Sequence, residues 1–364
     1  MKKCLSVLVL LMGSLTLSAC GDDAAKPQSD SVQAPQQTFK WKLVTAWPKN
    51  FPGLGRAPET FAKNVERMSN GRLQIKVYGA GEIVPGFEVF DAVSQGTAEM
   101  GHAAAYYWKG KVPAAQLFTA IPFGMNATEM NGWFHYGGGM ELWREVYKPF
   151  GIIPFAGGNT GVQLAGWFKK EINSIDDLKG LKMRIPGLGG EVLAKLGGVP
   201  VALTGGELFT SLQSGAIDAT EWVGPYNDLA FGLYKAADYY YYTGWHEPGP
   251  ALEFTVNEKA FNSLPDDLQA IIEIATRAVN QDMLDEYTAK NNEAMQSLLK
   301  KHNVDMRPFP DSVVAELKKA SLAVMQEQAA ADPMFAKVYK SYAEFQKGVT
   351  EYHRISEWEY YKNR

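Results

Sequence analysis

Two stretches of this 364-residue chain decide the expected fold: Phe90-Asp91-Ala92-Val93-Ser94-Gln95-Gly96-Thr97-Ala98-Glu99 and Phe209-Thr210-Ser211-Leu212-Gln213-Ser214-Gly215-Ala216-Ile217-Asp218. In both stretches, apolar residues at helical spacing run into a glycine, Gly96 or Gly215, that would cap the helix. An acidic residue then enters the next run of strand-forming residues. The matching order predicts that the chain contains an internal duplication.

Each stretch lies inside the same predicted order of elements. Around the first, the pattern predicts strands over 39–47, 73–78 and 100–104 and helices over 58–68 and 87–95. Around the second, it predicts strands over 181–185, 200–203 and 219–223 and helices over 190–196 and 207–213. Two such β-α-β-α-β units would face each other, and a ligand would bind between the carboxyl ends of their strands.

The rest of the chain is expected to connect the two units. A long amphipathic pattern over 266–295 predicts a bridging helix, and patterns over 313–328 and 334–345 predict further helices. The alternating segment 251–257 predicts a strand that crosses back to the first unit. We therefore expect an α/β fold of two lobes with crossing strands. Lobe I would comprise residues 39–160, with 248–285 returning to it, and lobe II residues 161–247 with the C-terminal helices 286–364.

The N-terminus has the pattern of an exported lipoprotein. Lys2 and Lys3 precede a short apolar run, and Leu17-Ser18-Ala19-Cys20 has the form of a lipobox. The pattern predicts a signal peptide over 1–19, lipidation at Cys20 and a flexible tether over 20–38. A plain secretory signal that happens to contain cysteine is the alternative.

The charge and the cysteine content argue against nucleic acid as a partner and against a disulfide in the mature chain. The formal net charge is −4 and becomes about −6 once Lys2 and Lys3 leave with the signal. Because the sequence has no basic stripe, nucleic acid is not an expected partner. The only other cysteine, Cys4, lies in the predicted signal, so the mature chain would have no disulfide.

The motifs of common enzymes are missing from the sequence. Its five histidines are far apart and show no zinc-binding spacing, and there is no nucleophile elbow or Walker loop. Gly187-x-Gly189-Gly190 follows a predicted strand, but Val192 stands where a dinucleotide fingerprint needs its third glycine. We therefore expect a protein that is not an enzyme and has no organic cofactor.

A few polar residues at predicted strand ends are candidates for binding. Arg184 ends a strand next to the glycine turn, where its guanidinium could hold a carboxylate with two hydrogen bonds. A surface arginine would have the same pattern. Gln163, the pair Glu221-Trp222 and the run Tyr106-Tyr107-Trp108 could line the cleft or could equally be packing residues.

Five segments together resemble the substrate-binding receptors of tripartite ATP-independent periplasmic (TRAP) transporters: 43–47, 104–108, 159–168, 178–187 and 215–225. The likeness covers nearly all of the mature chain and is closest to the branch that binds 2-oxo acids such as pyruvate, or lactate. The resemblance implies a two-lobed periplasmic binding protein fold with a long bridging helix. It also implies a periplasmic receptor, here a lipoprotein, that delivers its ligand to a separate membrane permease.

The resemblance also assigns roles to individual residues. Arg184 would pair with the substrate carboxylate, and a Na⁺ or Ca²⁺ ion beside it would be held by Gln163, Glu221 and the main-chain carbonyl of Trp222. Asn159 and Tyr106 or Tyr107 would be further ligand contacts, and Trp108, Trp167 and Trp222 would wall the pocket. The long C-terminal helix would fit a homodimer. A receptor for a C4-dicarboxylate, a lipoprotein adaptor and an enzyme are the alternatives.

Overall fold

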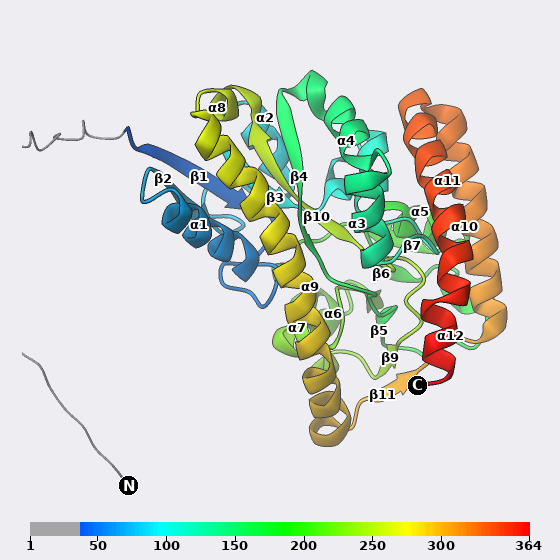
Figure 1. Cartoon of the computed structure of the whole chain (residues 1–364). Coiled ribbons are helices and arrows are strands. Elements are labelled where there is room, and N and C mark those ends of the chain that lie inside the picture. The colour runs from blue at the N-terminus through cyan, green and yellow to red at the C-terminus, as the bar shows by residue number, and fades with distance from the viewer. Residues whose placement is uncertain (1–36) are drawn as a thin grey trace, which may run out of the picture. The chain divides into compact units, whose positions relative to one another are not determined.

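The computed structural model describes residues 37–364, and Thr38–Arg364 form one compact unit (Figure 1). The predicted signal peptide, the lipidation residue Cys20 and most of the tether lie outside the described residues. Among the helices that are described, none is long and apolar enough to cross a membrane.

One sheet is built from the N-terminal half of the chain and one returning strand. Its order is β2 (Leu73–Tyr78), β1 (Phe39–Thr45), β3 (Met100–Ala103), β10 (Ala251–Asn257) and β4 (Ile152–Asn159). The first three strands are parallel, and β10 pairs antiparallel with both β3 and β4. The prediction that segment 251–257 crosses back to the first unit is confirmed.

The second sheet repeats this arrangement. Its order is β7 (Val199–Val201), β6 (Lys182–Arg184), β8 (Ala219–Thr220), β5 (Gly166–Phe168), β9 (Tyr239–Tyr241) and β11 (Asp305–Arg307). Strands β7, β6 and β8 are parallel, and β5 pairs antiparallel with β8 and β9. In both sheets three parallel strands are therefore followed by an antiparallel strand, β10 in the first sheet and β5 in the second.

The two matching stretches, which predict an internal duplication, have the same local geometry. Gly96 and Gly215 both end a helix in the left-handed region, with φ of +76° and +80°. The acidic residue that follows makes the same bond in each copy. Glu99 Oε2 accepts a hydrogen bond from the backbone N–H of Lys42 in β1 at 2.7 Å, and Asp218 Oδ2 accepts one from Lys182 in β6 at 3.0 Å. Each carboxylate thus ties one parallel strand to the next.

Helices cover both sheets. Those between the strands are α1 (Arg56–Met68), α2 (Val89–Ser94), α3 (Ala127–Tyr136), α4 (Gly139–Tyr147), α5 (Gly187–Lys195), α6 (Leu208–Ser214), α7 (Pro225–Phe231) and α8 (Glu258–Asn262). Short 3-10 turns lie at Gly86–Glu88, Ala105–Trp108, Pro113–Phe118, Lys148–Phe150, Ile175–Leu178, Gly205–Glu207 and Leu233–Lys235. The C-terminal helices are α9 (Asp266–His302), α10 (Asp311–Ala331), α11 (Pro333–Ile355) and α12 (Glu357–Lys362).

Helix α9 bridges the two halves, as the amphipathic pattern predicted. Its 37 residues begin after Pro265, with two aspartates in the first turn, and end at Asn303, which adopts the left-handed conformation. The acidic side chains at the N-terminus and the basic ones at the C-terminus stabilise the helix by interacting favourably with its dipole. Helix α9 packs against α1 and β4 of the first half and against α7 of the second, and it runs diagonally across the molecule (Figure 1).

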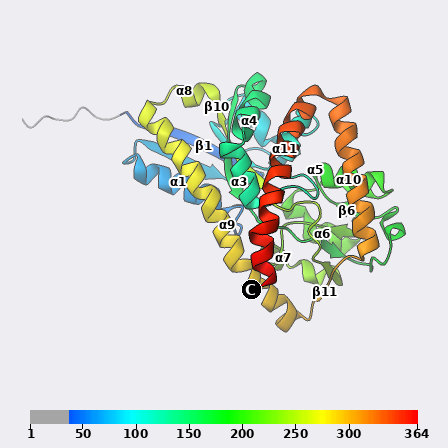
Figure 2. The ribbon, with the colours of Figure 1, turned by 45° about the vertical axis from the view of Figure 1, so that its right-hand side comes forward.

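The last long helices pack on different parts of the molecule. Helix α10 contacts α5 next to the second sheet, whereas α11 contacts α3 and α4 next to the first (Figure 2). The two helices also pack against each other. The lobe boundaries given above remain a prediction.

Aromatic side chains fill the core of the first half around a buried carboxylate. Phe118 stacks between Trp133 and Trp143, with ring centroids 5.7 and 4.9 Å away. Glu253 in β10 accepts hydrogen bonds from Trp108 Nε1 at 2.6 Å and from the Tyr147 hydroxyl at 2.8 Å. Burial raises the pKa of the Glu253 carboxyl to about 7.

A close approach of β5 to β8 requires glycine at position 166. Gly166 has φ +115°, and a Cβ there would lie 2.4 Å from the Thr220 carbonyl oxygen. Gly180 also has a positive φ, +72°, but a Cβ there would meet nothing within 4 Å. We expect Gly180→Ala to lower the free energy of unfolding by about 1 kcal/mol through backbone strain alone. Gly166→Ala should lower it by at least about 2 kcal/mol more, because β8 must move.

Equilibrium urea unfolding of the two variants measures this difference. Equal losses of stability in Gly166→Ala and Gly180→Ala would mean that β8 tolerates the added methyl group.

Candidate functional site

Arg184 is buried at the end of β6, with a side chain 2% exposed. Its Nε donates to the Leu203 carbonyl at 3.2 Å, and Nη1 donates to the Glu221 carbonyl at 3.3 Å and forms an ion pair with the Glu221 carboxylate. Its Nη2 makes only a long contact of 3.4 Å with the Tyr107 hydroxyl. Arg184 is therefore not a surface arginine, and one edge of its guanidinium is open to a ligand.

Glu221 and Gln163 each bury a side-chain oxygen near this arginine's partners: Glu221 pairs with Arg184, and the Gln163 backbone N–H donates to the Glu247 carbonyl at 3.1 Å. Glu221 follows β8 and is 0% exposed, and its Oε2 has no hydrogen-bond partner within residues 37–364. Gln163 Nε2 donates to Thr160 Oγ1 at 3.1 Å, which orients the amide, and Gln163 Oε1 has no partner in the same range. A buried oxygen without a partner costs about 1 to 3 kcal/mol, so these atoms point to a missing cation or donor.

The structure adds two residues that the sequence did not indicate. His246 and Glu247 lie in the segment that enters β10, and one ligand atom from each lies within 4.8 Å of the other and of a Glu221 carboxylate oxygen. Glu247 Oε2 and both imidazole nitrogens lack hydrogen-bond partners among the described residues. Burial, followed by the nearby Glu221, raises the pKa of Glu247 well above its usual range. Spacing could not reveal this cluster, because the pair His246-Glu247 is close to Glu221 only in space.

Trp222 lies beside Arg184, with the guanidinium carbon 4.9 Å from the centre of its ring. Trp47 of the first half approaches the same indole, with ring centroids 6.1 Å apart. The other two indoles expected to wall the pocket are held elsewhere. Trp108 donates to the core carboxylate of Glu253, and Trp167 stacks on Tyr240 at 4.0 Å. Trp222 is thus the one of the three whose ring lies beside Arg184.

The remaining predicted contacts have different surroundings. Tyr107 contacts Arg184, and burial raises the pKa of its hydroxyl to about 12. Tyr106 is buried next to it, with ring centroids 4.8 Å apart. Both polar atoms of the Asn159 side-chain amide bond to backbone groups. Nδ2 donates to the Gly249 carbonyl at 3.0 Å, and Oδ1 accepts from the Gly161 N–H at 2.9 Å. That pattern gives Asn159 a structural role, and its contact with ligand remains a prediction.

A cavity of about 290 Å³ opens beside Arg184, between the two halves. Its walls are mainly apolar and include Phe87, Tyr107, Pro186 and Leu203. Lys109 at its rim donates to Glu191 in α5 at 3.1 Å, so a contact between the halves closes over this space.

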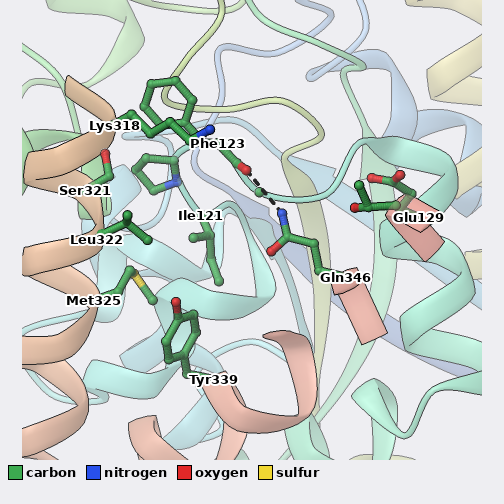
Figure 3. A pocket seen from close by; sticks show the side chains of 12 residues that line it. Ile121, Phe123, Glu129, Lys318, Ser321, Leu322, Met325, Tyr339 and Gln346 are labelled. Carbon is green, nitrogen blue, oxygen red and sulfur yellow. Dashed lines mark hydrogen bonds between the residues drawn. The ribbon is translucent and has the colours of Figure 1, made fainter. Parts of the chain in front are cut away.

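A larger cavity of about 480 Å³ lies between α10, α11 and residues 121–124, and none of those buried charges lines it (Figure 3). Gln346 donates across it to the Phe123 carbonyl at 3.1 Å. The acidic residue of this cavity, Glu129, already has two partners. Its carboxylate accepts a hydrogen bond from the Asn126 N–H at 2.9 Å and pairs with His353 at 2.6 Å. The converging oxygens without partners lie instead beside Arg184, and we place the candidate site there.

Residues 43–332 match the family of bacterial extracellular solute-binding proteins, family 7, also called DctP. The chain belongs to this family. A relative from Nostoc sp., a monocarboxylate 2-oxoacid-binding periplasmic protein, is 43% identical over 359 residues, which is 99% of this chain and 97% of that protein. Family members bind solutes outside the cytoplasm, so the chain is a TRAP-type receptor and not an enzyme, as the sequence predicted.

Solved structures give the same fold. A TRAP solute-binding protein from Colwellia psychrerythraea with bound calcium and pyruvate is 48% identical, covers 90% of this chain and 100% of its own, and has a TM-score of 0.88. One from Pseudoalteromonas atlantica with sodium and pyruvate is 46% identical, with the same coverage and TM-score. One from Bordetella bronchiseptica, a dimer with calcium and picolinate, is 38% identical, covers 88% of this chain and 95% of its own, and has a TM-score of 0.87. The predicted α/β fold is confirmed.

Asp228 in α7 fixes the loop that carries Glu221 and Trp222. Its Oδ2 accepts from Trp167 Nε1 at 2.9 Å and from the Tyr240 hydroxyl at 2.7 Å, and its Oδ1 accepts from the Gly224 N–H at 3.2 Å. Burial raises the pKa of this carboxyl to about 6, so it is ionised at neutral pH and accepts at both oxygens.

We expect Asp228→Asn to lower the free energy of unfolding by about 1 to 3 kcal/mol, because its amide group would face a buried N–H donor. Asp238→Asn removes the same charge at an exposed position and serves as the control. Chemical denaturation of both variants is the measurement. Similar stabilities would show that the acceptor at position 228 is not required.

Proposed function

We propose that this receptor binds a small 2-oxo or 2-hydroxy monocarboxylate together with a Na⁺ or Ca²⁺ ion and passes the acid to a membrane permease. The observation that carries the proposal is the juxtaposition of two features. Arg184 has an open guanidinium edge, and next to it three buried side chains, Gln163, Glu221 and Glu247, each have an oxygen without a partner in residues 37–364.

These side chains fit a hard cation. Carboxylate and amide oxygens are the ligands that Na⁺ and Ca²⁺ prefer, and two ligands of Ca²⁺ on opposite sides of the ion lie about 4.8 Å apart. The ligand atoms of Glu221 and Glu247 lie within that limit. Gln163, Glu221, Glu247 and the Trp222 carbonyl would hold the ion. When bound, the ion would attract both the carboxylate and the neighbouring 2-oxygen of the acid.

The number of cationic groups favours a single carboxylate on the ligand. Arg184 is the arginine at the site, and the side chains around it include the indoles of Trp222 and Trp47. A second carboxylate pressed against these rings would lose its hydration, and Lys109 at the cavity rim is already paired with Glu191. The Nostoc relative and the two pyruvate-bound structures support the same ligand class.

Calorimetry of the mature protein with pyruvate, lactate, 2-oxobutyrate, succinate and malate tests this proposal. We expect the monocarboxylates to bind and the C4-dicarboxylates not to bind. Arg184→Lys should weaken pyruvate binding by at least about 100-fold, because an ammonium group lacks the planar pair of donors. Lys182→Arg, at an exposed position of the same strand, is the control. If only the dicarboxylates bind, the ligand class is wrong while the receptor assignment stands.

We also infer that the receptor is a periplasmic lipoprotein anchored through Cys20. The support is the lipobox Leu17-Ser18-Ala19-Cys20 followed by a polar tether, which lies outside the described residues. Cys20→Ser should remove the acyl chain and move the protein from the membrane to the soluble fraction. Immunoblots of the two fractions measure this, and a variant that stays in the membrane fraction would rule out the anchor.

A homodimer through the C-terminal helices is part of the same proposal. Apolar side chains are exposed along the end of α11 and in α12, among them Ile355 at 78%, Tyr352 at 62% and Trp358 at 61%. Exposed apolar side chains grouped in this way are typical of protein interfaces. The Bordetella bronchiseptica protein is also a dimer, which supports a dimeric state here.

A further inference from the structure

We propose that Glu253 is a positioning residue for ligand binding, because through Trp108 it holds the turn of residues 105–109 in the place from which that turn meets the second half. The inference rests on the proposed function and goes beyond it, since Glu253 lies in the core of the first half, outside the candidate site. It is carried by a series of contacts that runs from the crossing strand β10 to Arg184.

The turn of residues 105–109 is the part of the first half that meets the second half beside the candidate site. Tyr106 packs against Gly187 at the start of α5, where a Cβ would lie 3.1 Å from the tyrosine Cβ. The Tyr107 hydroxyl lies 3.4 Å from Arg184 Nη2. Lys109 Nζ lies 3.4 Å from the Gly187 carbonyl oxygen. These contacts can form only when the two halves are close together.

Trp108, in the same turn, is buried inside the first half. Its side chain is 3% exposed and packs on Phe90 of α2, with ring centroids 5.5 Å apart. Its Nε1 donates to Glu253 Oε1 at 2.6 Å. Glu253 is 0% exposed, and its strand β10 pairs with β3 on one side and with β4 on the other. The hydrogen bond therefore ties the turn to a strand that is itself held on both edges.

The Glu253 carboxyl can hold Trp108 in either charge state. An indole N–H only donates, so it needs an acceptor wherever it is buried. The second oxygen, Oε2, accepts from the Tyr147 hydroxyl at 2.8 Å. Because a hydroxyl can accept as well as donate, a proton on Oε2 has a partner there, and Oε1 still accepts from Trp108. The hold on the turn does not depend on the ionisation of Glu253.

A fixed turn favours binding because its side chains are ordered before the halves meet. If the turn were loose, Tyr106 and Tyr107 would have to be ordered during closure, and part of the binding free energy would be lost. Glu253 thus acts on the ligand through Trp108 and the two tyrosines, without touching it.

Two variants that each remove one donor to the same carboxylate test this inference. Trp108→Phe releases the turn, whereas Tyr147→Phe, in α4, leaves the turn tied to β10. Calorimetry of the mature protein with pyruvate, in buffer that contains CaCl₂ and NaCl, measures the affinity. We expect Trp108→Phe to weaken binding by about 10-fold, because the ordering of the turn then falls on the binding step, and Tyr147→Phe to change it by less than about twofold. Urea unfolding of both variants shows whether they lose similar stability.

Substitutions of Glu253 test the same bond from its other end. Glu253→Leu removes the acceptor and should weaken pyruvate binding as Trp108→Phe does. Glu253→Gln should restore the affinity, because its carbonyl oxygen accepts from Trp108 while its amide donates to the Tyr147 oxygen. In Glu253→Leu, the further change Trp108→Phe should cost little more, since both remove one bond. If Glu253→Leu does not fold, the comparison of Trp108→Phe with Tyr147→Phe still decides.

Amide hydrogen exchange measures the turn without any ligand. The Tyr107 N–H donates to the Ala104 carbonyl at 3.1 Å, and the Lys109 N–H donates to the Tyr106 carbonyl at 3.2 Å. Amides of this turn should exchange faster in Trp108→Phe than in the unmodified protein, and Tyr147→Phe should leave them unchanged.

The results separate this inference from the proposed function. Equal pyruvate affinity in Trp108→Phe and Tyr147→Phe overturns the inference and leaves the proposed function standing, and so does full affinity in Glu253→Leu. If the unmodified protein binds no 2-oxo acid, the proposed function is wrong and the exchange data decide the inference alone. Faster exchange of the turn in Trp108→Phe but not in Tyr147→Phe then supports it, and equal exchange in the two variants overturns it.

Discussion

The binding region depends on the buried ion pair between Arg184 and Glu221. The two residues end up side by side because β6 and β8 are parallel neighbours, in which Arg184 is in register with Thr220. The pair uses the Nη1 edge of the guanidinium and one carboxylate oxygen, and it leaves Nη2 and the second oxygen pointing elsewhere. A buried pair with two unfilled positions can accept an anion on one side and a cation on the other.

The duplicated architecture places this pair where the two halves meet. In each half an acidic residue after a glycine cap joins two parallel strands, through Glu99 to Lys42 and through Asp218 to Lys182. The carboxyl ends of the strands therefore lie at corresponding edges of the two sheets. Residues of the first half, such as Tyr107 and Trp47, reach the charges of the second half from across this junction.

The sequence predicted the parallel strands, the helices between them and the bridging helix, because apolar periodicity and glycine caps are local, but it did not predict α3, α4 or β4. It could not decide between a buried and an exposed Arg184, since both have the same pattern, and the partner carboxylate comes from a different strand. His246 and Glu247 left no signal at all. They belong to the cluster only because the chain crosses back to the first sheet directly after them, which is a property of the tertiary fold. Asn159 shows the opposite case, in which a polar residue near the site satisfies backbone groups of its own loop.

Contacts between the halves at the rim are too weak to keep the site closed by themselves. The ion pair of Lys109 with Glu191 has partly exposed side chains, 41% and 22%. Such pairs are worth about 0 to 1 kcal/mol each. The larger free energy lies in the buried carboxyls Glu221 and Glu247, because each disfavours ionisation of the other and a cation between them would relieve this repulsion and attract a bound acid. Ligand and ion together therefore favour the closed arrangement far more than either does alone, and release of one weakens the hold on the other.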